Sequence, residues 1–248
     1  LILQEEKVPV LFRPFHEAEG NNNTDGSGAW FWWGSGGAEV YKKLWRLLYT
    51  TLTEKYGLNN LIWEVNLYTY ANSYQWYPGD DCVDIVGYDK YEGSPYTWET
   101  RAVTTVFLTL VNYTNDTKMV ALTENDVIPD IRNIVNEGSW WLYFCPWYGD
   151  FLINSRYNDP VLLNTIYNSE YVITLDELPE DLYSRPVNTT INKRYTSIKA
   201  EQSRKHLIVN SSSSKQISAR SDFFSLSGRR VDLKSKKFLI RGIYIKKK

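Results

Sequence analysis

The sequence has only two cysteines and no long apolar run. Cys82 and Cys145 lack the spacing of metal ligands and give little support for a disulfide, so we expect each to be a small buried hydrophobe near a strand. No stretch approaches the roughly 18 consecutive apolar residues of a membrane helix, and no signal peptide opens the chain. These features argue against a disulfide-stapled domain, a cysteine metal site and a membrane span.

The chain also lacks a glycine-rich phosphate loop. Its one glycine-dense stretch is GSGAWFWWGSGG, at residues 26–37, and the interior of that stretch is aromatic. A dinucleotide-binding fold needs small residues at such a turn so that the backbone can approach the pyrophosphate. The pattern therefore argues against a nucleotide site and favours aromatic side chains that line a surface.

Charge is divided unevenly along the chain. Residues 1–187 carry 12 Lys and Arg against 26 Asp and Glu, whereas residues 188–248 carry 16 against 3. We therefore expect an α/β domain over residues 1–180, a linker over 181–215 and a basic β-rich tail over 216–248. No stacking aromatics interleave with the charges of the tail as single-strand binding requires, so no nucleic-acid partner is predicted.

Hydrophobic segments in the first part alternate between the strand and the helix pattern. Strands are expected at residues 8–15, 61–65, 83–89, 119–123 and 140–144, and helices at about 38–56, 98–112, 131–136 and 160–167. Such alternation predicts a parallel sheet with right-handed crossovers, either doubly wound or closed into a barrel.

Polar and aromatic residues follow four or five of these strands, which favours the (β/α)8 TIM barrel, whose site lies at the carboxyl face. A whole barrel has eight units and ~250 residues, but only five units fit here. We expect barrel strands 4 to 8 to be present and the first three units to be absent. An incomplete barrel exposes a sheet edge, so this chain by itself is expected to be poorly stable or inactive.

Two glutamates stand directly after strands. Glu17 follows the first strand and Glu124 the fourth, so both are expected at the same barrel mouth. Retaining glycoside hydrolysis needs two carboxyl groups ~5 to 5.5 Å apart, one protonated and one ionised. The tryptophans after Glu17 favour its neutral form by desolvation, whereas Tyr91 and polar neighbours favour a charged Glu124. For either residue alone, a strand-end surface acid is the simpler interpretation.

Several segments together resemble glycoside hydrolase family 26, namely PVLFRPFHE with WFWWG, GLNNLIWEVN, WYPGDDCVDIVGYDKY, and VALTEND before WWLYFCPW. The best-known members of that family are retaining β-mannanases with a (β/α)8 fold. The resemblance implies an endo-β-1,4-mannanase that hydrolyses mannan or galactomannan by double displacement, without a metal or organic cofactor. The same fold acting on xylan or β-glucan, or a non-catalytic glycan-binding remnant, are the alternatives.

The resemblance also implies roles for individual residues. Glu17 matches the general acid/base and Glu124 the nucleophile, and the matched substrate-site positions are His16, Trp30, Tyr91, Trp147 and Asp84. For Asp84, a hydrogen bond to a neighbouring backbone amide is an equally good explanation. Residues 20–27 lie where the family has a short turn, and we expect this insertion to reshape the substrate groove.

The end of the chain, SDFFSLSGRRVDLKSKKFLIRGIYIKKK from Ser221, resembles the carboxyl-terminal sorting region of bacterial type IX secretion substrates. That resemblance implies a secreted or cell-surface bacterial protein, with secretion machinery as a partner and a signal peptide in the absent front part. A plain solvated basic β tail is the alternative.

Overall fold

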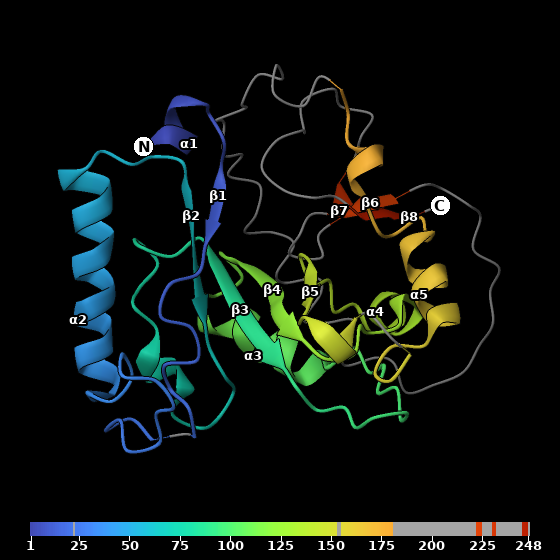
Figure 1. The fold of residues 1–248 in the computed structure, drawn as a ribbon, viewed down its shortest axis with the longest axis horizontal. Helices are drawn as coiled ribbons and strands as arrows, with labels where there is room; N and C mark the ends of the chain where they lie inside the picture. The colour runs from blue at the N-terminus through green and yellow to red at the C-terminus, as the bar shows by residue number, and fades with distance from the viewer. Residues whose placement is uncertain (22, 153–154, 181–221, 225–229, 232–244, 248) are drawn as a thin grey trace.

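A five-stranded parallel sheet forms the centre of the protein (Figure 1). The computed structural model describes residues 1–21, 23–152 and 155–180, and 222–224, 230–231 and 245–247 in the tail. The strands lie side by side in chain order and are β1 (Val10–Phe12), β2 (Leu61–Asn66), β3 (Ile85–Lys90), β4 (Met119–Asn125) and β5 (Phe144–Pro146). Each neighbouring pair is parallel. An all-parallel sheet in sequential order with helical crossovers is an arc of a (β/α)8 barrel, as expected.

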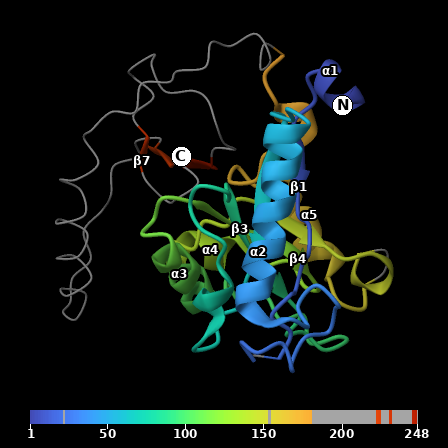
Figure 2. The same cartoon turned by 90° about the vertical axis from the view of Figure 1, so that its left-hand side faces the viewer.

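Helices follow the strands and cover the outer face of the sheet. They are α1 (Ile2–Glu5), α2 (Gly37–Thr50), which continues as the π-helical turn η1 (Thr51–Lys55), α3 (Thr104–Tyr113), α4 (Ile131–Glu137) and α5 (Pro160–Tyr167). Three short 3-10 helices are η2 (Ser73–Trp76), η3 (Gly149–Phe151) and η4 (Leu175–Glu177). Figures 1 and 2 show α2 running along the outside of the sheet.

The core lies between this helical layer and the sheet. Trp45 of α2 is fully buried and packs edge-on against Trp63 of β2, with ring centroids 5.8 Å apart. Along β2, Trp63 and Val65 belong to this outer core, whereas Glu64 and Asn66 alternate with them and point to the inner side of the arc. The inner side of β2 therefore carries polar groups toward its carboxyl end.

The first strand is shorter than the eight residues expected from its apolar run. Pro9 and Pro14 flank β1 on either side, and neither has an N–H for a strand ladder. The expected strand at 8–15 was therefore too long, because hydrophobicity alone does not show that the two prolines lack the N–H groups needed for strand pairing.

Two other expected elements are displaced. The helix predicted at 98–112 begins only at Thr104, since Trp98 and Val103 both have positive φ values, of 45° and 47°. The indole N–H of Trp141 donates to the carbonyl of Ala102 (2.8 Å), which holds this segment as a loop. The strand predicted at 140–144 is β5, at residues 144–146, because Trp140 and Trp141 are buried in the outer core instead.

The tail contains a second sheet of three short antiparallel strands, β6 (Asp222–Phe224), β7 (Arg230–Val231) and β8 (Ile245–Lys247), in the order β7-β6-β8. The expected linker at 181–215 lies outside the described residues. In the part of the chain that the structure describes, no helix combines the length and apolar character needed to cross a membrane.

Candidate active site

Three charged side chains from three strands meet at the carboxyl edge of the sheet. Arg13, just past β1, donates from Nη1 to Oδ2 of Asp89 (3.1 Å) and from Nη2 to Oε1 of Glu124. The Asp89 side chain is completely buried and that of Glu124 is 7% exposed. Two carboxylates at this depth repel each other, and the guanidinium between them offsets that cost with charge-assisted hydrogen bonds.

This arrangement shifts the protonation of Asp89 and Arg13. Burial raises the pKa of Asp89 to about 7, with the charge of Arg13 acting in the opposite direction and that of Glu124 adding to the rise. For Arg13, burial lowers the pKa, but Asp89 and Glu124 outweigh it and the net pKa is raised. Arg13 is therefore a fixed cation beneath the site.

Irregular register in β4 brings the two acids together. The pairing of β3 with β4 shifts between Tyr88 and Asp89, so that Asp89 pairs with Glu124. Thr123, the residue that the shift passes over, donates its hydroxyl to Oδ1 of Asp89 (2.5 Å). Bulges of this kind re-aim side chains next to functional sites.

Glu124 is held through both carboxylate oxygens. Arg13 bonds Oε1, and the hydroxyl of Tyr91, just past the end of β3, donates to Oε2 at 2.9 Å. Burial raises the pKa of Tyr91 and the hydrogen bond to Glu124 raises it further, so the phenol remains a donor. The two contacts fix the carboxylate in one orientation.

Glu17 lies in the turn after β1 and is held by the next strand. Its backbone N–H donates to Oδ1 of Asn66, at the end of β2 (2.7 Å), and its Oε1 accepts from the hydroxyl of Tyr68 (2.7 Å). Phe15 and Glu17 have φ values of 54° and 49°, which non-glycine residues rarely adopt. Such strain persists only where the surroundings over-determine it, and here it aims the carboxyl group.

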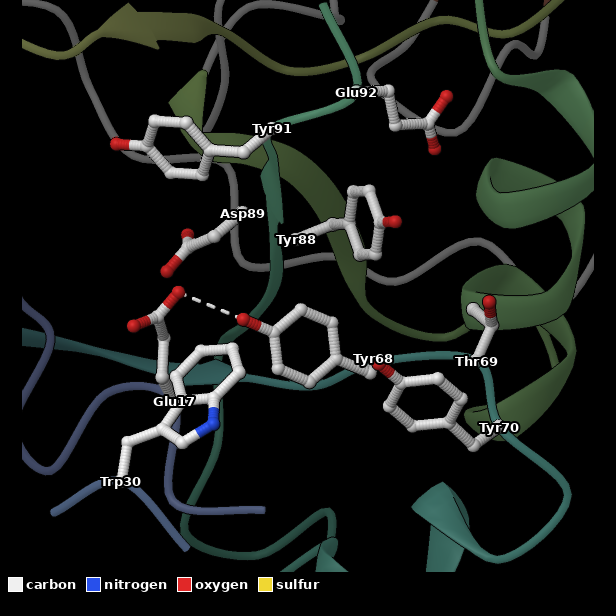
Figure 3. A pocket seen from close by; sticks show the side chains of 9 residues that line it. All are labelled: Glu17, Trp30, Tyr68, Thr69, Tyr70, Tyr88, Asp89, Tyr91 and Glu92. Carbon is white, nitrogen blue, oxygen red and sulfur yellow. Dashed lines mark hydrogen bonds between the residues drawn. The ribbon is translucent and has the colours of Figure 1, made fainter. Parts of the chain in front are cut away.

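A cavity of about 280 Å³ opens over these groups (Figure 3). Figure 3 shows the carboxylate of Glu17 beside Asp89 and the hydroxyl of Tyr68, with the ring of Trp30 alongside. Trp30 is 50% exposed and meets Tyr68 edge-on, with centroids 6.1 Å apart. The cavity is lined mainly by aromatic rings and acids: Glu17, Trp30, Tyr68, Thr69, Tyr70, Tyr88, Asp89, Tyr91 and Glu92.

His16 packs beside the site between aromatic rings. Its imidazole lies 4.9 Å from the Phe31 ring and 5.6 Å from the Trp33 ring, and its carbonyl accepts the indole N–H of Trp33 (2.7 Å). Burial lowers the pKa of His16, and the nearby Arg13 lowers it further. The imidazole is therefore neutral at pH 7.

The turn that carries Glu17 is closely packed. The backbone of Gly34 lies so near the carbonyl of Ala18 that any side chain at position 34 would collide with it. Asn21 donates its N–H to the carbonyl of Gly28 (2.9 Å), which closes the base of the inserted loop. Within the same turn Glu19 is buried and accepts from the hydroxyl of Ser73 (2.5 Å); burial raises its pKa to about 7.

The structure brings most, but not all, of the expected site residues together. Glu17, Trp30 and Tyr91 line the cavity, and Glu124 is bonded to Tyr91. Trp147 follows β5 at the same edge of the sheet, is 41% exposed and donates its backbone N–H to Asn125 (2.8 Å), but it does not line the cavity. Asp84 precedes β3, at the opposite end, where its Oδ2 accepts the N–H of Trp63 (2.9 Å). This hydrogen bond to a backbone amide is the other explanation given above for Asp84.

Three residues at the site were not singled out from the sequence. Arg13 carried a signal, because it is the one charge in an otherwise apolar run. Asp89 also carried one, as the last residue of an expected strand. Tyr68 gave none, since its loop is rich in tyrosine and only the fold selects the one that reaches Glu17.

Comparisons with known proteins point to one family of glycoside hydrolases. The sequence model of Glycosyl hydrolase family 26 matches residues 2–177. A mannan endo-1,4-beta-mannosidase from Thermothelomyces thermophilus is 40% identical over 177 residues, which is 71% of this chain and 33% of that protein. Mannan endo-1,4-beta-mannosidase A from Piromyces sp is 36% identical over 177 residues, 71% of this chain and 26% of that protein.

Two solved structures are also similar. A ruminal GH26 endo-beta-1,4-mannanase is 51% identical with a TM-score of 0.69, and the match covers 72% of this chain and 38% of that one. A beta-mannanase from a symbiotic protist of the termite Reticulitermes speratus, solved with a gluco-manno-oligosaccharide, is 33% identical with a TM-score of 0.63, over 72% and 51% of the two chains. The chain thus spans 33% and 26% of the length of these two curated relatives.

Proposed function

Because the chain belongs to glycosyl hydrolase family 26, we propose that it supplies the two catalytic carboxylates of a retaining endo-β-1,4-mannanase. The observation that carries the proposal is the contrast between two acids at one sheet edge. Glu124 is bonded through one oxygen to the cation Arg13 and through the other to Tyr91, whereas Glu17 is bonded to a neutral tyrosine hydroxyl beside an indole ring. The two acids thus have different hydrogen-bonding partners at one sheet edge, in keeping with the two different roles that retaining hydrolysis requires.

In the first step Glu17 donates its proton to the glycosidic oxygen as that bond breaks. Oε of Glu124 attacks the anomeric carbon at the same time, and a covalent glycosyl-enzyme forms. In the second step the ionised Glu17 takes a proton from water, and the resulting hydroxide oxygen attacks the anomeric carbon. Glu124 leaves as a carboxylate, and Glu17 is again protonated.

The neighbouring residues support these two steps. Tyr91 and Arg13 position the nucleophile before the attack and stabilise its negative charge when it leaves. Trp30 forms an apolar wall beside Glu17. The neutral imidazole of His16, the residue before Glu17, is a second ring near the site. Trp147, at the end of β5, is proposed as a platform for the sugar ring at the cleavage point, since its indole is partly exposed at the same edge.

The proposed substrate is β-mannan or galactomannan, because the two curated relatives described above carry the name mannan endo-1,4-beta-mannosidase. The test offers mannan, xylan and mixed-linkage β-glucan to the chain and to a fusion of it with the amino-terminal barrel segment of a family member. Release of manno-oligosaccharides that Glu17→Ala or Glu124→Ala abolishes would support the proposal. Release from xylan or β-glucan alone would overturn the substrate, and binding without release would overturn the catalytic role.

We also propose that the basic tail directs secretion. Its support is compositional, since residues 188–248 carry 16 Lys and Arg against 3 Asp and Glu and end in the segment that resembles a sorting region. Deleting residues 216–248 and locating the protein in cell and medium fractions of a bacterium with type IX secretion tests the idea. Unchanged export of the shortened protein would contradict it.

A further inference from the structure

A second cavity, of about 570 Å³, lies outside the candidate active site. It is built from the start of α2, the loop between β2 and β3, and the end of α3, and it shares no lining residue with the first cavity. These elements flank β2, β3 and β4, which are the interior strands of the sheet, so the cavity does not depend on either sheet edge. Its volume is in the usual range for small-molecule sites, about 300 to 1,000 Å³.

Three tyrosines form the aromatic wall of this cavity. Tyr74 is 53% exposed and stacks on Tyr77, with ring centroids 6.0 Å apart and planes at 27°. On its other side Tyr74 meets Tyr113 at 5.3 Å and 51°. Tyr77 is buried, and its hydroxyl donates to Oδ1 of Asp80 (2.8 Å). The exposed ring is therefore held in place before any ligand arrives, which lowers the entropy that binding would cost.

The charges at the rim come in opposite signs. Lys42 and Glu39, one helical turn apart on α2, form an ion pair at 2.6 Å, and Asp80 already accepts from Tyr77. There is no surplus of cations that would select a phosphate or an acidic peptide. A pyranose ring suits this lining, since it has an apolar C–H face for the tyrosine ring and a rim of hydroxyls for the polar groups.

We propose that this second cavity binds a neutral hexopyranose chain, and that it is an additional mannan-binding site outside the catalytic cavity. The choice of mannan rests on the proposed function. One loop supplies both sites, with Tyr68 and Tyr70 in the first cavity and Tyr74 in the second. A polymer held at Tyr74 is thereby kept near the catalytic residues, which raises its local concentration there.

The test uses migration of the full chain in native gels that contain soluble glucomannan, galactomannan or xylan. All proteins carry Glu17→Gln, so that the polymer stays intact. Tyr74→Ala removes the exposed ring, and Tyr56→Ala is the matched control because it is also 53% exposed but lies outside both cavities. We expect Tyr74→Ala to raise the dissociation constant for a mannan about fivefold, the size of one aromatic contact, and Tyr56→Ala to leave it unchanged.

The outcomes separate this inference from the proposed function. Equal retardation of Tyr74→Ala and Tyr56→Ala overturns the second site, even where the enzyme with Glu17 intact cleaves mannan. Loss of retardation with Tyr74→Ala supports the site, even where no glycan is cleaved. If Tyr74→Ala loses retardation in xylan gels but not in mannan gels, the second site is supported and mannan is ruled out as its ligand. Absence of retardation for every protein overturns the inference.

Discussion

Arg13 and Glu124 are 111 residues apart in the chain and form a hydrogen-bonded ion pair at the carboxyl edge of the sheet. The pair joins β1 to β4 across two intervening strands, and Asp89 from β3 completes it. It is at once a long-range link in the fold and part of the candidate active site. Changes at this point should therefore affect stability and catalysis together.

Replacing Arg13 by Met should destabilise the protein strongly. The change leaves two buried carboxylates without their cation, and breaking a buried ion pair in this way costs about 3 to 5 kcal/mol. The measurement is urea denaturation at pH 7. Arg46→Met serves as the control, since its partner Asp81 is exposed and such pairs contribute about 0 to 1 kcal/mol. Equal losses of unfolding free energy in the two variants would show that the Arg13 ion pair contributes no more to stability than an exposed one.

Tyr91→Phe should slow catalysis while the fold persists. It removes only the hydroxyl that donates to Oε2 of Glu124, and a hydrogen bond to a charged group contributes about 1.5 to 3 kcal/mol. We expect kcat on mannan to fall by about 10- to 100-fold with a smaller change in KM. The exposed Tyr148→Phe is the control. An unchanged kcat for Tyr91→Phe would remove Tyr91 from the proposed mechanism.

Lys90 and Asp126 form a buried ion pair that anchors the segment after β3. Lys90 Nζ lies 3.3 Å from Oδ1 of Asp126, and Oδ2 of Asp126 accepts the N–H of Gly93 (2.5 Å). Tyr91 lies between Lys90 and Gly93. Asp126→Asn should therefore weaken the hydrogen bond that Tyr91 donates to Glu124. We expect a loss of about 3 to 5 kcal/mol in unfolding free energy and a fall in kcat. Full stability of Asp126→Asn in thermal unfolding would contradict this.

Glu19 should make the protein less stable as pH rises. Its pKa is raised from 4.5 to about 7 by burial, so between these values the folded state binds the proton more than the unfolded state does. The raised pKa therefore leaves the unfolding free energy unchanged below pH 4.5 and lowers it by up to about 3 kcal/mol above pH 7. Glu19→Gln should flatten the decline of unfolding free energy between these pH values.

The check for Glu19 is a series of denaturation curves from pH 4 to 8. The exposed Glu54→Gln controls for the loss of one negative charge. Asp89, whose pKa is also raised to about 7, contributes a slope of the same sign, so the decline should shrink in Glu19→Gln without vanishing. A pH profile identical to that of the parent would show that Glu19 does not titrate in this range.

Sequence patterns located the acids well, because a strand end is a point that periodicity can find. Glu17 and Glu124 follow apolar runs, and the parallel sheet brings such ends to one edge. The patterns did less well with aromatics. Trp76 stands two residues before the Pro78-Gly79 pair, a setting typical of a surface loop, yet it is 1% exposed because the ring of Tyr41 from α2 packs against it. Burial of this kind depends on a contact between residues that lie more than thirty positions apart in the chain, and local composition does not predict such a contact.

The same limit explains the other differences. Asp84 was placed among the site residues by its motif, but its position before β3 puts it at the opposite end of the sheet, bonded to Trp63. Cys145 was expected to be buried and is exposed, in the middle of β5, the strand at the edge of the sheet. By contrast, Trp45 and Trp63 lie on element faces that periodicity defines, and both are buried.

The turn that holds Glu17 is tied to the start of α2 through the inserted loop. Gly34 fits directly against Ala18, and Asn21 and Gly28 pin the two stems of the inserted loop together. The loop beyond that clasp is itself anchored, since the carbonyl of Thr24 accepts the N–H of Ala38 (2.8 Å) and a side chain at position 26 would collide with the carbonyl of Ser35. The inserted loop therefore forms one packed unit with the turn of Glu17 and the start of α2, so that a change in its length or a side chain at position 26 should displace both.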